Sequence, residues 1–317
     1  MFINYLTLDN YITSTSNEHF NDLLPFENVH AENIFDSVNN LLEKNPDLLT
    51  SSNSIIYLIN TPSGFGSVLT VFLQNTLYLL KKNPSLICLP HFSINNDNFK
   101  YHDESYNNSF FLYFKYKNVI DISKYKLYMV QSHLINDSPF VEFIIPLLSN
   151  SFNKSAITWF HENFSLRIGN DVKLKMDRIK KQNKNVIGIH LRSLAQKAEH
   201  NKEYLNISLD DRLINIKNKL DKTYNTYHIV IGTDVNQYIT RSKYIFGEKI
   251  TYLSDIKRIS NEEDSIPQLE SFKGFNLGKD ILYECLLLSL CDHVFVSKSN
   301  IPFIITALNP NISLEEY

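Results

Sequence analysis

Residues 185–200 read NVIGIHLRSLAQKAEH, and this stretch decides how the second half of the chain is interpreted. Residues 185–191 form a short apolar run, which is typical of a strand buried on both faces of a parallel sheet. His190 lies near the end of this run and Arg192 directly after it. Because strand side chains alternate, these two side chains leave the strand on the same side. A buried strand that ends in polar groups indicates the ligand-binding edge of an α/β sheet.

Apolar strands and amphipathic helices alternate on both sides of this stretch. After it, the sequence predicts strands over 226–234, 249–255 and 293–299, and helices over 208–222, 236–246, 278–291 and 301–308. Before it, the sequence predicts strands over 54–60, 86–92, 110–116 and 126–132, a helix over 67–82, and a second helix over 138–152 that is interrupted at Pro146. This order predicts an α/β fold with mainly parallel sheets covered on both faces.

The length of the chain limits the number of domains, and its net charge limits the class of partner. A chain of 317 residues is long enough for two domains. The polar stretch near 165–182 predicts a boundary between a domain over 1–165 and a domain over 166–317. A formal charge of −3 lacks the basic excess of a general nucleic-acid binder, so we expect no nucleic-acid partner, although a local basic pocket for one anion remains compatible. The oligomeric state is left open.

Cysteine usage and hydropathy bear on the compartment. Cys88, Cys285 and Cys291 lie in apolar surroundings without C-x-x-C spacing, so we expect buried free thiols in a reducing compartment. The first twenty residues lack the features of a signal peptide, and no apolar run is long enough to span a bilayer. We expect a cytoplasmic protein, with contact at the inner face of the membrane compatible with this interpretation.

Three strand ends in the second half carry polar residues. They are His190 with Arg192, Thr233 with Asp234, and the run Ser297, Lys298, Ser299 and Asn300. In parallel strands these ends meet at one edge, and the glycines of the turn 61–66, Gly64 and Gly66, offer a close backbone approach from the first half. That turn lacks the G-x-G-x-x-G and G-x-x-x-x-G-K-[ST] patterns. One arginine, several hydroxyls, helix N-termini and one carboxylate suit a phosphate joined to a ribose or another sugar.

Each of these residues also has a structural interpretation. His190 can be a hydrogen-bonded core histidine, and Arg192 a surface ion-pair partner. Asp234 can cap the following helix, and Ser297 and Ser299 can be N-caps. Their occurrence together at matching strand ends favours a site.

The stretch VIGIHLRS resembles the strand that carries the H-x-R motif of the α1,2-, α1,6- and protein O-fucosyltransferases. The residues before it, FHENFSLRIGNDVKLKMDRIKKQNKN, resemble the helix that precedes this strand in the family. The family's strand that ends in T-D is similar to VIGTDVNQ. Its helix, strand and Ser-rich turn near the C-terminus are similar to GKDILYECLLLSLCDHVFVSKSNIPFIITAL. Its N-terminal Gly-rich loop and helix are similar to INTPSGFGSVLTVFLQN. The resemblance covers about 155–308 and one N-terminal patch.

The resemblance implies a GT-B-like fold with two Rossmann-like domains facing across a cleft, the first on the acceptor side and the second binding the nucleotide sugar. It implies a GDP-sugar donor, usually GDP-fucose, with no metal and no further cofactor. The sequence has no D-x-D triplet; Glu262 and Asp264 come nearest, in an acidic run that is typical of a solvated surface. Without a cation, protein donors stabilise the leaving diphosphate, and Arg192 suits this role.

Roles for the remaining residues follow from the resemblance alone. His190 supports the sugar nucleotide or the loop. Glu199 corresponds loosely to a base candidate, with an exposed loop residue as the alternative, and Ser193 stands where some members have a second arginine. The donor-binding set is Gly64, Gly66, Asp234, Asp280, Ser297, Lys298, Ser299 and Asn300.

The resulting expectation is an inverting glycosyltransferase that moves fucose or a related sugar to a hydroxyl of a glycan acceptor, in bacterial surface polysaccharide biosynthesis. Two alternatives stay open. One is a GT-B enzyme that uses another nucleotide sugar, such as a heptose donor. The other is a non-catalytic nucleotide- or glycan-binding protein on the same scaffold, which Ser193 and the loose match of Glu199 favour.

Overall fold

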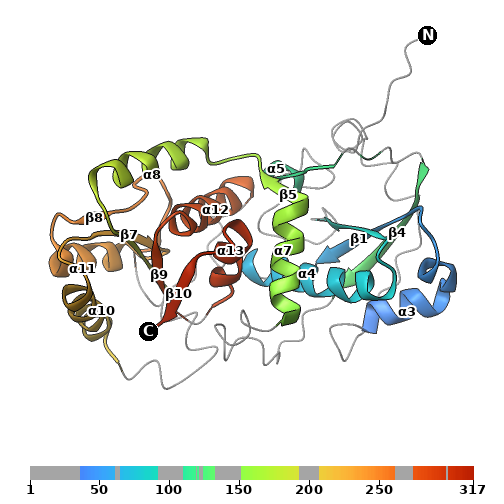
Figure 1. Ribbon diagram of the computed structural model, residues 1–317, viewed down its shortest axis with the longest axis horizontal. Helices are drawn as coiled ribbons and strands as arrows, with labels where there is room; N and C mark the ends of the chain where they lie inside the picture. Colours follow the sequence, from blue (N-terminus) through green and yellow to red (C-terminus); the bar gives the residue numbers. More distant parts are fainter. Residues whose placement is uncertain are drawn as a thin grey trace, which may run out of the picture. The chain divides into compact units, whose positions relative to one another are not determined.

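A computed structural model describes residues 36–60, 65–91, 110–118, 120, 124–132, 151–192, 207–260, 274–297 and 299–317. Their contacts divide them into two compact units. The first unit holds the described residues up to Ser132 together with Ser151–Arg167, and the second unit begins at Ile168 and runs to Tyr317. Each unit contains its own parallel sheet (Figure 1). Among the described residues, the chain passes from the first unit to the second after Arg167.

The first unit is built on a three-stranded parallel sheet in the order β2-β1-β4. Strand β1 (Ser54–Asn60) lies in the centre, between β2 (Ile87–His91) and β4 (Lys126–Ser132). Helix α4 (Phe65–Lys82) connects β1 to β2. A shorter helix, α3 (Asp36–Lys44), and a 3-10 turn, η1 (Pro46–Leu49), precede the sheet.

The strand predicted over 110–116 is wrong for its first half. Residues Phe110–Tyr113 form a short helix, α5, and only Phe114–Tyr116 form a strand, β3. Strand β3 pairs antiparallel with β5 (Phe164–Leu166), which follows helix α7 (Ser151–Asn163). A strand would send alternate side chains to opposite faces. The helical turn instead buries most of these aromatic side chains in one cluster, whose ring contacts join Phe72, Phe110, Phe111, Phe114, Trp159, Phe160 and Phe164.

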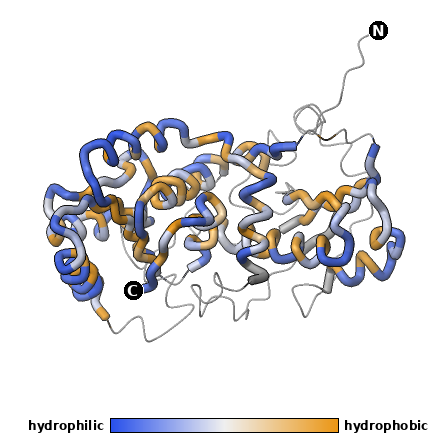
Figure 2. The backbone as a smooth tube through the Cα atoms, in the orientation of Figure 1, coloured by the Kyte–Doolittle hydropathy of each residue, from blue (hydrophilic) through white to orange (hydrophobic). Residues whose placement is uncertain are grey.

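The second unit is built on a five-stranded sheet in which every pairing is parallel, in the order β10-β9-β6-β7-β8. Its strands are β6 (Val186–Leu191), β7 (His228–Thr233), β8 (Ile250–Thr251), β9 (His293–Val296) and β10 (Ser313–Glu316). Its helices are α8 (Asn170–Gln182), α10 (Leu209–Thr223), α11 (Asn236–Phe246), α12 (Phe275–Ser289) and α13 (Ile301–Leu308). Figure 2 shows the central strands as mainly hydrophobic and α8 as mainly hydrophilic.

The predicted α/β class with parallel sheets is confirmed by both units. Several predicted elements differ in extent. The strand predicted over 249–255 shortens to the two residues of β8, and the polar stretch predicted as a boundary contains α8. Strand β10 was not predicted at all. Of the helix predicted over 138–152, residues 138–150 lie outside the described residues.

Helix α12 lies against the sheet where two neighbouring strands carry glycine. A Cβ atom placed on Gly232 of β7 would come within 2.7 Å of Leu288 Cδ1, and one on Gly188 of β6 would come within 3.0 Å of Leu288 Cδ2. The side chain of Val294 in β9 also faces Gly188, so its neighbour Phe295 points to the opposite face. There Lys219 of α10 lies 5.9 Å from the centre of the Phe295 ring. Helices α12 and α10 therefore cover opposite faces of the sheet.

The three cysteines are buried and free, as the sequence predicts. Burial raises the pKa of the Cys88 thiol to about 12, so this thiol stays protonated at neutral pH. Within the described part of the chain, none of the helices combines the length and the apolar character needed to cross a membrane.

The close approach of α12 yields a prediction about Gly232. We expect Gly232→Ala to lower the free energy of unfolding by about 1–3 kcal/mol, because the new methyl group overpacks against Leu288. Leu288→Ala removes that neighbour, so the double variant should lose less stability than the sum of the two single variants. Urea unfolding of the four proteins measures the coupling. Combining Gly232→Ala with Leu213→Ala, a buried position on α10, is the control and should be additive; equal coupling in both pairs would contradict the packing described.

Candidate functional site

Four parallel strands of the second unit end at one edge of the sheet, which we call the carboxyl edge. It comprises the C-terminal residues of β6, β7, β9 and β10 and the residues that follow them. His190, the penultimate residue of β6, pairs in register with Gly232 on one side and Val296 on the other. Its side chain is buried, whereas Arg192, the first residue after β6, is half-buried. The structure thus places both residues at the carboxyl edge.

Hydrogen bonds join the ends of β6, β9 and β10. His190 Nδ1 lies 3.2 Å from the hydroxyl oxygen of Ser297, the first residue after β9. The Tyr317 hydroxyl donates to the His190 carbonyl oxygen at 2.8 Å, and the Tyr317 N–H donates to Val296 O at 3.4 Å. Burial raises the pKa of the Tyr317 phenol, while the nearby Arg212 and the Ser297 hydroxyl act in the opposite direction. The phenol therefore stays protonated and available as a donor at neutral pH.

The turn between β9 and α13 uses its serines differently. Ser299 is buried, and its hydroxyl oxygen accepts a hydrogen bond from the Ile301 N–H at 3.2 Å, at the start of α13. Asn300, at the N-cap position of α13, makes no capping bond with its side chain. Ser299 thus satisfies a helix terminus, whereas Ser297, at the carboxyl edge, contacts His190.

Val235, and not Asp234, occupies the N-cap position of α11. Helix α11 begins after Val235 without a side-chain capping bond, and the Thr233 hydroxyl accepts from the Val235 N–H at 3.2 Å instead. The backbone of Asp234 pairs with the loop after β8, since its carbonyl oxygen accepts from Ile259 N at 2.8 Å. The half-buried Asp234 is therefore held by its main chain.

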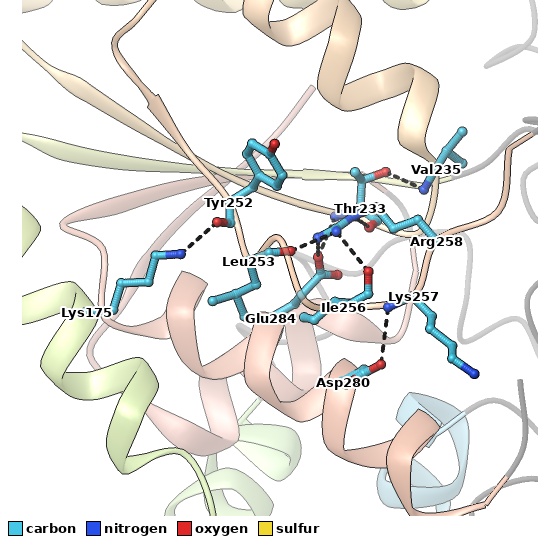
Figure 3. A network of polar contacts seen from close by, with 10 residues as sticks. All are labelled: Lys175, Thr233, Val235, Tyr252, Leu253, Ile256, Lys257, Arg258, Asp280 and Glu284. Atoms are coloured by element: carbon cyan, nitrogen blue, oxygen red, sulfur yellow. Dashed lines mark hydrogen bonds and ion pairs between the residues drawn. The ribbon is translucent and has the colours of Figure 1, made fainter.

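Arg258 fixes that loop to the end of β7 and to α12 (Figure 3). Its side chain is 2% exposed, and Nη2 lies 2.6 Å from Glu284 Oε1. Nε donates to Thr233 O at 3.0 Å. Nη1 donates to Leu253 O at 2.8 Å and Ile256 O at 3.2 Å. A single buried guanidinium thereby satisfies three main-chain carbonyls and one carboxylate.

Carboxylates gather on the α12 side of this region. Burial raises the pKa of Glu284 to about 7, while the ion pair with Arg258 and the Thr233 N–H at 3.3 Å oppose the rise. Burial also raises the pKa of Asp280, which accepts from Lys257 N at 3.4 Å. Asp234 is close enough to raise the pKa of Glu284 further. Such acceptors suit ligand hydroxyl groups; within the described residues no group of three or more His, Cys, Asp or Glu side chains is arranged to hold a metal ion.

The sequence interpretation missed Arg212, Arg258, Glu284 and Tyr317. For two of these residues the sequence contains a recognisable pattern. Arg212 is spaced four residues before Ile216, on the buried stripe of α10, and Glu284 interrupts the apolar run of α12. Arg258 lies in an irregular loop, and Tyr317 follows a strand that was not recognised, so no periodicity marks either one.

Four further predicted site residues lie in the first unit or outside the described residues. Gly66 belongs to the first unit, in the first turn of α4, where it is buried and its carbonyl oxygen accepts from the Thr70 hydroxyl at 2.8 Å. Gly64, Glu199 and Lys298 lie outside the described residues, as do Glu262 and Asp264 of the acidic run.

In comparisons with known proteins, neither a protein-family model nor a curated protein matches this chain.

The Arg258 contacts predict a large cost for their removal. We expect Arg258→Met to lower the free energy of unfolding by about 3–5 kcal/mol at pH 8, because the Glu284 carboxylate is left buried without its partner. The folded-state pKa of Glu284, about 7, lies above its ordinary value of 4.5, so the folded protein binds the carboxyl proton more tightly than the unfolded chain does. Protonation of Glu284 therefore stabilises the folded protein at low pH, and this stabilisation is lost as the pH rises through about 7. The cost of Arg258→Met should therefore be smaller at pH 5.

Urea unfolding at both pH values measures this effect. Glu284→Gln is the control, since it keeps an acceptor for Arg258 and removes the titration. A loss below about 1 kcal/mol for Arg258→Met at pH 8 would show that the loop is held by other contacts.

Proposed function

We propose that the carboxyl edge of the second unit binds a GDP-sugar and that the protein is a metal-independent, inverting glycosyltransferase. In this proposal it transfers fucose, or a related sugar, to a hydroxyl group of a glycan acceptor. The proposal joins the two units in a GT-B arrangement, with the Gly64–Gly66 turn on the acceptor side. A role in polysaccharide biosynthesis at the cytoplasmic face of the membrane is part of the same proposal.

The observation that carries the proposal is the contact between His190 and Ser297. These residues are 107 positions apart in the sequence, yet the imidazole Nδ1 and the hydroxyl oxygen lie 3.2 Å from each other. The histidine belongs to the stretch that resembles the H-x-R strand, and the serine belongs to the stretch that resembles the Ser-rich turn. Two independent parts of the resemblance thus meet at the edge where doubly wound sheets bind their ligands.

The proposed reaction is a single displacement. The acceptor oxygen attacks the anomeric carbon of the sugar, the bond from that carbon to the diphosphate oxygen breaks, and GDP leaves with the bonding electrons. A base removes the acceptor proton; Glu199 stays the candidate for this role. Negative charge develops on the leaving diphosphate, and Arg192 supplies a fixed positive charge with a planar pair of donors. Asp234 and Asp280 supply acceptors for ribose hydroxyls.

Donor selectivity tests this proposal. We expect calorimetry to show tighter binding of GDP than of UDP, CMP or ADP. UDP binding that equals or exceeds GDP binding would rule out the GDP assignment. Hydrolysis of GDP-fucose without an acceptor provides the second readout: selective GDP binding with no hydrolysis and no transfer would favour the non-catalytic nucleotide-binding alternative.

Arg192 is the residue on which the chemistry depends most. We expect Arg192→Ala to fold normally and to lower transfer by about 10²–10³-fold, the usual cost of removing a preorganised donor to a developing charge. Arg192→Lys keeps the charge but loses the planar fork, so it should not restore activity. Near wild-type transfer by either variant, measured with a donor shown to bind, would make Arg192 structural.

A further inference from the structure

Two arginines are buried in the second unit, and their surroundings differ. The residue exposure of Arg258 is 8% and that of Arg212 is 5%. Arg258 directs its guanidinium to three carbonyl oxygens and to Glu284. Among the described residues, Arg212 makes one long hydrogen bond, from Nε to Ser208 O at 3.4 Å, and its Nη1 has no acceptor. The second guanidinium is therefore buried but poorly satisfied.

The acidic residues beside Arg212 have other partners. Asp210 forms an ion pair with Arg241, whose Nε lies 2.9 Å from its Oδ1. Asp211 lies 2.6 Å from the Ser208 hydroxyl oxygen, within the N-cap of α10. Within the described residues, no carboxylate forms an ion pair with Arg212. Burying a guanidinium without a counter-ion costs several kcal/mol, so the fold retains this charge at an energetic cost.

The position of Arg212 points to the carboxyl edge. It lies in the fourth position of α10, the next described helix after β6, and its Nε donates back to Ser208 at the start of that helix. Its charge lowers the pKa of the Tyr317 phenol, against the larger effect of burial. The Tyr317 hydroxyl in turn donates to the carbonyl oxygen of His190, at the end of β6. Arg212 thus lies beside the residues that join the strand ends.

We propose that Arg212 is an anion-binding residue and that its unsatisfied guanidinium edge pairs with a phosphate group of the ligand at the carboxyl edge. The inference rests on the proposed function for the identity of that ligand, a nucleoside diphosphate sugar. A second arginine would divide the charge of the diphosphate with Arg192. It would also supply the positive charge that Ser193 does not provide in the sequence H-L-R-S. The hydrogen bonds from the Arg212 guanidinium to the phosphate would be charge-assisted, and bidentate where the phosphate oxygens allow it.

Arg212→Met and Arg258→Met distinguish an anion-binding arginine from a structural one. Without ligand, we expect Arg212→Met to melt at or above the wild-type temperature, because the change removes an uncompensated buried charge and keeps much of the packing volume. Arg258→Met should melt several degrees lower. With inorganic pyrophosphate as the probe, at constant ionic strength, calorimetry should show binding to the wild-type protein and about ten- to a hundredfold weaker binding to Arg212→Met.

Three results would overturn the inference. They are unchanged pyrophosphate affinity in Arg212→Met, no pyrophosphate binding by the wild-type protein, and a melting temperature of Arg212→Met as low as that of Arg258→Met. Failure of the proposed function can be distinguished from failure of this inference, because it appears in the selectivity of the protein among nucleotide bases. Equal binding of GDP and UDP, with pyrophosphate binding that still depends on Arg212, would keep the anion-binding residue and reject the GDP-sugar assignment.

Discussion

The second unit depends on how closely α12 can lie on its sheet. Leu288 occupies the space that side chains at Gly188 and Gly232 would otherwise fill, so the helix rests directly on β6 and β7. This contact brings Glu284 within reach of the end of β7, where it meets Arg258 and the Thr233 N–H. The packing of one leucine against two glycines therefore sets the position of the acidic groups at the carboxyl edge.

The same edge combines satisfied and unsatisfied charge. Arg258 and Glu284 form a closed set of contacts that fixes the loop after β8, and the main chain of Asp234 is held by pairing with Ile259. On the other face of the sheet, the Tyr317 hydroxyl contacts the end of β6 and Arg212 lies nearby with an open donor. An acidic side held by hydrogen bonds and an ion pair, together with a basic group that has spare hydrogen-bonding capacity, agrees with the proposed ligand, which carries both hydroxyls and phosphates.

The sequence predicts regular elements well where one period dominates. Residues 54–60, 126–132, 236–246 and 301–308 form the predicted strands and helices with unchanged bounds, because each has an apolar pattern between clear ends. The strand predicted over 110–116 is wrong in its first half. Aromatic residues favour strands locally, but here their side chains pack into one aromatic cluster from a helical turn.

At the carboxyl edge, sequence order predicts that His190, Asp234 and Ser297 share an edge, because parallel strands end together. It does not predict contacts that depend on packing between distant segments. The partners of Arg258 come from β7, α12 and the loop after β8, and Tyr317 reaches β6 across β9. Arg212 could be recognised only as a charge on an apolar stripe, without any sign of what it faces.

Hydrogen–deuterium exchange with and without GDP tests most directly whether the carboxyl edge is the ligand site. We expect GDP to slow exchange in peptides that cover the ends of β6, β7 and β9, and in the first turn of α10. The amino ends of the same strands should be unaffected and serve as an internal control. Protection confined to the first unit, or absent from all of these strand ends at saturating GDP, would show that the carboxyl edge is not the GDP site.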